Sequence, residues 1–223
     1  MISIIIPTQR SSSDLQNIRV KLQDSAFIGE IIIVAHHTLM SCIDPLDKNE
    51  CILFSHSVGR GHKLLEGVTK ATGDIILFLH DDTILPCNWD SVILQALEDE
   101  QVSGGAFSLR FDIKNFTLTF LIWLSNLFYR ITGELWGDRA IFIRAEILRS
   151  NLNVLNTPIM EDVNLSYLMK KEGKTLLLSQ TVITSAESFI KRGVLSHTLK
   201  IMICRFLYFI GLDPTRIHRY YHQ

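Results

Sequence analysis

Two acidic pairs in the chain have the composition and the position of reactive carboxylates. The first pair, Asp81 and Asp82, follows His80 and the apolar run 75–79. Adjacent carboxylates repel each other unless a cation lies beside them, and a divalent metal ion bound to a phosphate would supply that charge. The alternative is a solvated turn in which an aspartate caps the following helix. The residues themselves leave both interpretations open.

The second pair, Glu161 and Asp162, stands at the start of a predicted helix. Carboxylates in a first helical turn interact favourably with the helix dipole, which is an ordinary structural role. The functional alternative is that one carboxylate faces a cleft and accepts a proton as a general base. The pair alone favours the structural role, and its combination with the first acidic pair strengthens the case for the functional role.

The segments that would position these carboxylates alternate between strands and helices. Continuous apolar runs predict strands buried on both faces, and helical spacing with capping residues predicts the helices between them. In the first half, expected strands cover 2–6, 30–34, 51–54 and 75–79, and expected helices cover 11–22, about 60–71 and 89–97. This order predicts an α/β fold with a doubly wound, mostly parallel central sheet and helices on both faces. Ligands bind outside the carboxyl ends of such strands, which is where 80–82 fall.

The second half of the chain changes its pattern. Phe107, Leu109 and Phe111 alternate with polar residues, which predicts a strand with one exposed face. The helix that begins at the second acidic pair is expected to end at Gly173. Further strands are expected at 140–143 and 175–178, a helix at 116–131, and a helical C-terminal tail whose last helix opens at Pro214.

Composition limits the class of protein. The 223 residues are 47% hydrophobic and 20% charged, which fits one globular domain. The net charge of −1 gives no basic field for nucleic acid, so no nucleic-acid partner is expected. The cysteines, at positions 42, 51, 87 and 204, form no Cys-x-x-Cys pair, which indicates free thiols and a cytoplasmic location. The first apolar run has no basic segment before it and ends at Pro7, so a strand is expected rather than a signal peptide.

Two long apolar and aromatic segments, 116–131 and 194–210, complicate this assignment. Neither contains 18 uncharged apolar residues in succession, so membrane-spanning helices are not expected. Buried or oligomer-facing helices are slightly favoured over interfacial helices at the inner face of the membrane. Peripheral membrane contact and homo-oligomer formation through these segments both stay open.

Several short motifs together resemble a known family. The motifs occupy 3–8, 59–60, 73–83, 104–107, 137–138, 160–163 and 192–195. In this order and spacing they resemble the family-2 glycosyltransferases with the GT-A fold. The chain is most similar to a bacterial subgroup associated with radical-SAM and selenium-related proteins. The resemblance extends from residue 3 to about residue 212, nearly the whole chain.

The resemblance implies an inverting transfer of a sugar from a nucleotide-diphosphate donor. Asp82 and His80 occupy the family's metal-binding Asp-x-Asp element, whose first position is histidine in the subgroup, with Asp81 as a helper. The cofactor would be a divalent metal, Mn or Mg, and a neutral imidazole is a softer ligand for it than oxygen. Asp162 matches the catalytic base, with Glu161 beside it.

The resemblance also implies a division of the single domain 1–223. Residues 1–100 would bind the donor, 101–190 would form the acceptor side, and 191–223 would be a helical tail. Implied donor-binding residues are Pro7, Thr8, Ala35, Arg60 and Asp81, and implied acceptor-side residues are Gly137 and Asp138. The acceptor would be a saccharide or a lipid. For Arg60, contact with phosphate and exposure as a surface arginine both remain open.

Two departures from the family pattern support a competing hypothesis. Gln9 and Arg10 stand where the family usually has Asn-Glu, and Ala35 replaces the aspartate that reads the nucleotide base. The replacement of that aspartate leaves three outcomes open: another nucleotide, a lipid-phosphate donor, or lost activity. The alternative to an enzyme is therefore a non-catalytic binding or interaction protein on the same fold.

Overall fold

The computed structural model describes residues 1–10, 22, 25, 27–40 and 49–223. The helix expected at 11–22 lies outside the described residues except for Leu22, which is buried. Cys42 also lies outside them. Of the other cysteines, Cys51 and Cys87 are exposed and Cys204 is buried, and all three are free thiols.

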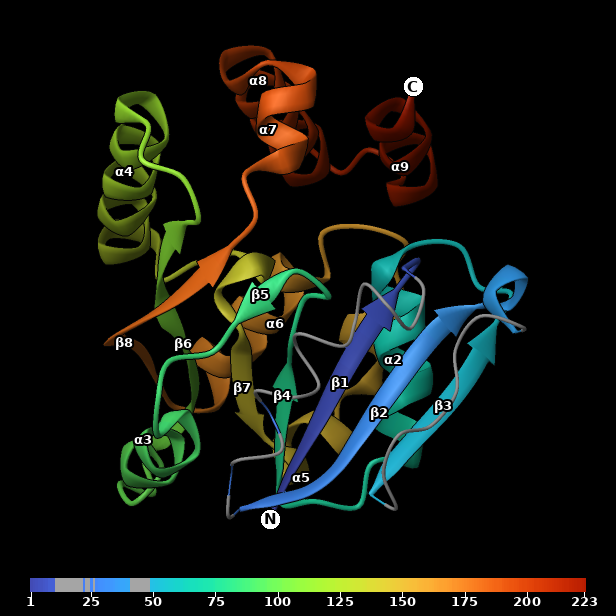
Figure 1. Cartoon of the computed structure of the whole chain (residues 1–223), viewed down its shortest axis with the longest axis vertical. Coiled ribbons are helices and arrows are strands. Elements are labelled where there is room, and N and C mark those ends of the chain that lie inside the picture. Colours follow the sequence, from blue (N-terminus) through green and yellow to red (C-terminus); the bar gives the residue numbers. More distant parts are fainter. Residues whose placement is uncertain (11–21, 23–24, 26, 41–48) are drawn as a thin grey trace.

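The described part of the chain forms an eight-stranded sheet with the order β3-β2-β1-β4-β7-β6-β8-β5 (Figure 1). The strands are β1 (Ile2–Thr8), β2 (Ile28–His36), β3 (Glu50–Ser55), β4 (Ile75–Phe78), β5 (Thr83–Ile84), β6 (Val102–Phe111), β7 (Ile141–Arg144) and β8 (Lys174–Thr184). The first four strands in the sheet order pair in parallel, as do β6 and β8. Strand β7 is antiparallel to both of its neighbours, and β5 is antiparallel to β8. The predicted α/β fold with a mostly parallel central sheet is confirmed.

The continuous apolar run of β1 explains its central place. Strand β1 lies between β2 and β4, and successive side chains of a strand point to opposite faces. Ile4 and Ile6 join the core on one face of the sheet, and Ile5 joins the core on the other. A strand covered on both faces needs hydrophobic residues at every position, which is the pattern that the sequence contains.

Helices cover both faces of the sheet. Helix α3 (Trp89–Ala96) contributes Trp89 and Ile93 to the first core. Helix α2 (Arg60–Lys70), the short α5 (Ala145–Arg149) and α6 (Glu161–Glu172) pack against the second core. Helix α4 (Phe116–Thr132) follows β6, and the chain ends in α7 (Glu187–Arg192), α8 (Val194–Phe209) and α9 (Pro214–His222). Figure 1 shows α4 and α7–α9 beyond the edge of the sheet to which the arrowheads of β1, β2 and β3 point.

The second half of the sheet differs from the prediction in its bounds. Strand β6 begins before the alternating segment, and it includes Gly104 and Gly105. A Cβ atom at Gly105 would lie 2.3 Å from the carbonyl oxygen of Leu176 in β8, so glycine permits this close strand approach. Strand β8 extends six residues beyond the expected end at 178. The exposed face predicted for β6 is present at Arg110, which is exposed between buried neighbours.

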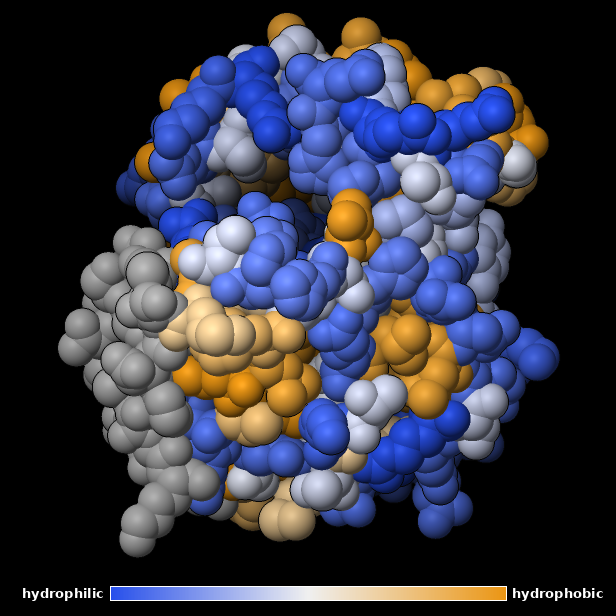
Figure 2. Space-filling model, turned by 90° about the vertical axis from the view of Figure 1, so that its right-hand side faces the viewer, coloured by the Kyte–Doolittle hydropathy of each residue, from blue (hydrophilic) through white to orange (hydrophobic). Residues whose placement is uncertain are grey.

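The segments 116–131 and 194–210 form helices, but the expectation that these helices are buried is wrong, and contact with another copy or with a membrane stays a prediction. Helix α4 buries only Leu118 and Ser125, and α8 buries only His197 and Cys204. Their large hydrophobic side chains are instead exposed. Figure 2, viewed from the side of β3 and α9, shows hydrophobic atoms along the upper end of the molecule, where Figure 1 places α7–α9. Among the described residues, no helix has the length and hydropathy needed to cross a membrane.

Candidate active site

The first acidic pair lies in the turn between β4 and β5, at the carboxyl end of β4. At the end of the neighbouring β1, Thr8 Oγ1 donates a hydrogen bond of 2.8 Å to Asp81 Oδ2. The Arg10 guanidinium contacts both carboxylates, with Nε 3.4 Å from Asp81 Oδ1 and Nη2 3.7 Å from Asp82 Oδ2. The parallel pairing of β1 with β4 brings these groups to one edge of the sheet.

The environment of this pair is partly buried and rich in charge. Burial raises the pKa of Asp82, and the charge of Asp81 raises it further, whereas Arg10 opposes both effects. From helix α2, Lys63 Nζ donates a hydrogen bond of 3.3 Å to the carbonyl oxygen of Thr8. Burial lowers the pKa of Lys63, and Asp81 opposes that shift. Positive side chains therefore offset the repulsion between the two carboxylates.

The chemistry of the acidic pair fits a divalent cation. Mg²⁺ and Mn²⁺ prefer oxygen ligands, and Mg²⁺ is usually held by one or two carboxylates together with substrate phosphates. Within the described ranges, no group of three or more His, Cys, Asp or Glu side chains is placed to hold a metal ion. Burial, followed by the charge of Arg60, lowers the pKa of His80 well below its usual value, so the imidazole is neutral at pH 7. The carboxylates of Asp81 and Asp82 suit an ion whose remaining ligands come from a bound phosphate or water.

The second acidic pair opens helix α6. Met160, which precedes it, adopts a positive φ of 66°, and this turn starts the helix. Glu161 is buried and forms an ion pair with Arg60, whose Nη2 also donates a hydrogen bond of 3.2 Å to the carbonyl oxygen of Gly137. Arg60 is therefore not a solvated surface arginine. Its contact with a phosphate remains a prediction.

The Asp162 carboxylate is fixed by backbone and side-chain donors. The backbone N–H groups of Gly137 and Val163 donate hydrogen bonds of 3.0 and 2.9 Å to Oδ2 and Oδ1. Nη1 of Arg205, from helix α8, lies 3.4 Å from Oδ2, and the same guanidinium forms an ion pair with Glu134. Burial, followed by the charge of Glu161, raises the pKa of Asp162 to about 7. A carboxyl group with this pKa is suited to accept a proton near neutral pH.

Gly137 and Asp138 form the short 3-10 turn before β7. Through its N–H and C=O groups, Gly137 joins Asp162 to Arg60, so the turn is tied to the second acidic pair. Burial raises the pKa of Asp138, and the charge of Arg139 opposes the shift. One buried oxygen of Asp138 has no hydrogen-bond partner among the described residues. A ligand hydroxyl could satisfy this acceptor.

Charge interactions link the two acidic pairs. Asp138 contributes to the raised pKa of Asp82, although it is the smallest of the causes. Arg60 acts on His80 in the first group and on Asp162 in the second. The two pairs, 80 residues apart in the sequence, therefore belong to one neighbourhood at the carboxyl edge of the sheet.

The remaining predicted donor residues lie at the same edge. Pro7 is partly exposed at the end of β1, and Thr8 is buried. Ala35, at the end of β2, pairs with Thr8 and is 0% exposed, so its side chain contacts the core. Of the two histidines that follow it, His37 stacks on His56, which follows β3, with ring centroids 4.0 Å apart. Donor binding by Pro7, Thr8 and Ala35 remains a prediction.

Four charged residues of the site were not predicted as functional: Arg10, Lys63, Glu134 and Arg205. Their contacts join segments that are far apart in the sequence, so no local spacing predicts them. Arg205 does carry a signal, because it interrupts the otherwise apolar stretch 201–210 and such an arginine needs a partner.

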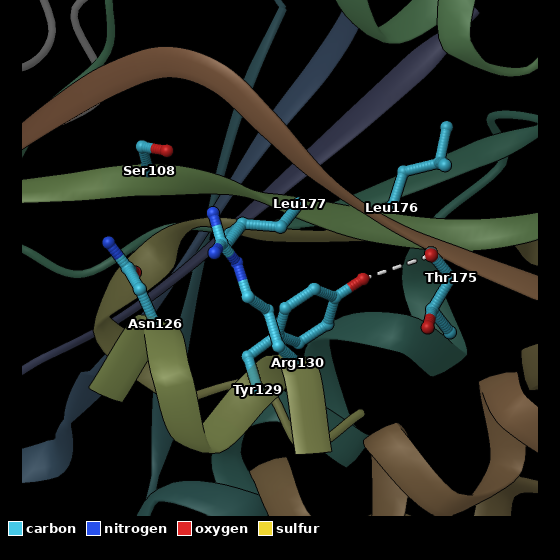
Figure 3. A pocket seen from close by; sticks show the side chains of 7 residues that line it. All are labelled: Ser108, Asn126, Tyr129, Arg130, Thr175, Leu176 and Leu177. Atoms are coloured by element: carbon cyan, nitrogen blue, oxygen red, sulfur yellow. Dashed lines mark hydrogen bonds between the residues drawn. The ribbon is translucent and has the colours of Figure 1, made fainter. Parts of the chain in front are cut away.

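A separate cavity of about 390 Å³ lies beneath α4 (Figure 3). Tyr129 from α4 donates a hydrogen bond of 3.0 Å to the carbonyl oxygen of Thr175, which spans the gap between the helix and β8. Asn126 and Arg130 line the same cavity. It contains none of the predicted site residues, so the reaction chemistry is not assigned to it.

Comparisons with known structures support the fold. The chain is similar to the crystal structure of S. aureus TarS 1-349, with 12% identity, a TM-score of 0.59, and coverage of 99% of this chain and 69% of that one. The same protein in complex with UDP-GlcNAc matches with 14% identity and a TM-score of 0.56, over 82% of this chain and 56% of that one.

A second solved structure is the mannosyltransferase PcManGT from Pyrobaculum calidifontis in complex with GDP-Man and Mn2+. It matches with 15% identity and a TM-score of 0.65, over 99% of this chain and 68% of that one. At these identities the likeness establishes the GT-A fold alone. A comparison with curated protein sequences found no match. The sequence profile described as "Glycosyl transferase family 2" matches residues 3–146, which is more than half of the chain. The chain therefore belongs to glycosyl transferase family 2.

Proposed function

We propose that this protein is an inverting glycosyltransferase that moves a sugar from a nucleotide-diphosphate donor to an acceptor hydroxyl. Family membership supports glycosyl transfer, and two of the similar structures hold UDP-GlcNAc or GDP-Man. The observation that carries the proposal is the meeting of the two acidic pairs at one edge of the sheet, where Arg60 forms an ion pair with Glu161 and its charge acts on His80 beside the first pair.

The first acidic pair is the proposed donor end of the site. Asp82, with Asp81 as helper and His80 beside them, would hold a Mn or Mg ion, as the similar mannosyltransferase structure contains Mn2+. Such an ion supplies positive charge that stabilises a departing diphosphate. Lys63, which bonds to the backbone at Thr8, adds a protein cation on the same side.

Asp162 is the proposed base. Its carboxylate takes the proton of the acceptor hydroxyl while that oxygen attacks the anomeric carbon. The new carbon–oxygen bond forms on one face as the bond to the nucleoside diphosphate breaks on the other, which inverts the configuration. The N–H of Gly137 and the guanidinium of Arg205 hold the carboxylate in place, and burial, followed by the charge of Glu161, keeps its pKa high. Asp138, with one unpaired buried oxygen, is the proposed partner of an acceptor hydroxyl.

The finer assignments are part of the same proposal. The acceptor is a saccharide or a lipid, and the reaction takes place in the cytoplasm, where exposed thiols such as Cys51 and Cys87 persist. The division into a donor half, 1–100, an acceptor half, 101–190, and a helical tail remains a prediction. Histidine at position 80 is the feature that supports the radical-SAM-associated subgroup.

One observation favours the non-catalytic alternative. The Arg10 guanidinium already contacts both carboxylates of the first pair, and it lies 3.8 Å from Glu187 as well. A cation held by the protein in this position competes with a metal ion. If a metal ion never displaces Arg10 from the two carboxylates, the protein would bind its partners without transferring a sugar.

A thermal-shift screen tests the proposed donor and metal site. UDP-sugars and GDP-sugars are tested with Mn²⁺ and with a chelator, because a ligand that binds the native state raises the melting temperature by mass action. The proposal expects a metal-dependent rise with one donor, absent in Asp82→Ala and retained in Glu100→Ala, a control acid exposed between α3 and β6. A rise that persists in the chelator and in Asp82→Ala would refute the metal site.

A further inference from the structure

We propose that the outward faces of α4 and α8 dock this protein on the surface of a lipid bilayer with anionic headgroups. Both helices present hydrophobic side chains to solvent at helical spacing, and both lie at the end of the molecule beyond the sheet edge (Figure 1). We name these exposed side chains the docking face. The docking proposal does not depend on the proposed transfer reaction.

The stripe on α4 runs along the whole helix. Its exposed members are Phe116, Phe120, Trp123, Leu124, Leu127 and Ile131. They recur at intervals of three or four residues, except that Trp123 and Leu124 are adjacent, so they share one side of the helix. Phe116 is 88% exposed and Trp123 is 58% exposed, and the rings of Phe120 and Trp123 stack on each other with centroids 5.7 Å apart.

Helix α8 repeats this arrangement. Its exposed members are Leu195, Leu199, Met202, Ile203, Phe206 and Phe209. Successive members are again three or four residues apart, except that Met202 and Ile203 are adjacent. Phe209 is 80% exposed. The inward side of the same helix carries the polar groups, including His197 and Arg205. The usual arrangement of an amphipathic helix in a globular protein is thus reversed, with the apolar side outward.

The charge around the docking face favours an anionic partner. Apart from the inward-facing Arg205, helices α4 and α7–α9, with their connections, contain six Lys or Arg residues and two acidic residues, although the whole chain has a net charge of −1. Arg130 on α4 and Arg192, Arg216 and Arg219 on the C-terminal helices are exposed. Each basic residue near a surface of anionic lipid strengthens binding to it. Apolar side chains bordered by basic ones are the pattern of a helix that lies in the membrane interface.

A second copy of the chain fits this surface less well. A two-fold dimer would place the same patch on both partners, so the excess positive charge of one docking face would oppose that of the other. An anionic bilayer complements that charge and accepts the Phe, Trp and Leu side chains at the same time. The observations therefore favour lipid over self-association.

Docking would bring the candidate base close to the bilayer. On its inward side α8 carries Arg205, which lies 3.4 Å from Asp162. The same helix therefore carries part of the docking face and a contact to the carboxylate. Resting on the proposed function, this arrangement favours an acceptor carried by a lipid.

Sedimentation with vesicles tests the docking face. The probes are vesicles of phosphatidylcholine mixed with phosphatidylglycerol and vesicles of phosphatidylcholine alone. We expect binding to the mixed vesicles that weakens as salt is added. Removing one aromatic side chain that the bilayer would cover, in Trp123→Ser or Phe206→Ser, should lower the affinity by about tenfold or more. Arg130→Gln should lower it by about fivefold. Tyr167→Ser, which removes an aromatic side chain exposed on α6, is the matched control and should bind normally.

Fluorescence of Trp123 gives a second readout that does not depend on removing hydrophobic mass. Of the three tryptophans, Trp89 is buried and Trp136 is partly buried, so Trp123 is the most exposed. Mixed vesicles should shift the emission to the blue, and Trp123→Phe should bind equally well without the shift. A protein that stays in the supernatant with both vesicle types would overturn the proposal. So would a stable dimer in light scattering that Phe206→Ser dissociates.

Discussion

Replacing Asp162 with asparagine tests the base more sharply than any other single change. Asparagine keeps the shape of the side chain, but Gly137 and Val163 donate to different oxygens of Asp162, so the single carbonyl oxygen of asparagine can accept only one of these two hydrogen bonds. It cannot take a proton from an acceptor. General-base catalysis contributes about 10²- to 10⁴-fold, so the rate should fall by that factor while donor affinity is unchanged.

The raised pKa of Asp162 sets the expected pH dependence. With a pKa of about 7, the carboxyl group is ionised in roughly one hundredth of molecules at pH 5 and roughly nine tenths at pH 8. The wild-type kcat/KM should therefore rise about tenfold from pH 5 to 6, about fivefold from pH 6 to 7, and level off above 8. The profile is measured as release of nucleoside diphosphate at saturating acceptor, with Asp99→Asn as a control.

The same shift predicts a stability effect of opposite sign. A folded pKa above the unfolded value means that the native state holds its proton more tightly, so stability falls as the pH rises from about 4 through 7. A shift of about three units corresponds to at most about 4 kcal/mol. Asp162→Asn should remove this decline in urea unfolding curves. A rate profile with a pKa near 4, together with an Asp162→Asn variant of normal rate, would refute the assignment of the base.

Other predictions address the neighbouring groups. Arg60→Met leaves Glu161 buried without its ion-pair partner, and it should lower the free energy of unfolding by about 3–5 kcal/mol in urea titrations; a loss below about 1 kcal/mol would contradict the pairing. Arg10→Ala removes a partly exposed competing cation, and the Mn²⁺ dissociation constant measured by electron paramagnetic resonance should fall about fivefold rather than rise. Gly61→Ala puts a Cβ 2.2 Å from the carbonyl oxygen of Thr157. The clash should outweigh the gain of about 1 kcal/mol in helix propensity and lower the melting temperature, and an unchanged or higher value would contradict it.

The sheet could be predicted because its signal is local. Each buried parallel strand is a continuous apolar run, and β1 to β4 follow such runs closely. Strand β8 was predicted too short because Ser179 and Gln180 interrupt its apolar pattern. Its pairing with β6 extends the strand beyond them, and pairing with a distant segment leaves no mark in the local sequence.

The candidate site could be predicted only in part for the same reason. Asp82 and Asp162 carry a local signal, because each belongs to an acidic pair next to a strand or helix boundary, but each pair alone also fits an ordinary structural role. Arg10 stands 71 positions before Asp81 in the sequence, and Arg205 stands 43 positions after Asp162. Their contacts with these carboxylates therefore depend on the fold. For α4 and α8, periodicity predicts an apolar stripe and does not say whether protein or solvent faces it.

The most direct test of the account is a proton NMR time course of donor turnover with Mn²⁺, in the wild type and in Asp162→Asn. The account predicts that the wild type releases nucleoside diphosphate and that the transferred sugar first appears with the anomeric configuration opposite to that of the donor. It also predicts that Asp162→Asn binds the donor equally well and reacts at least about 100-fold more slowly. A product that keeps the donor's configuration, or equal rates for the two proteins, would contradict the proposed inverting mechanism with Asp162 as base.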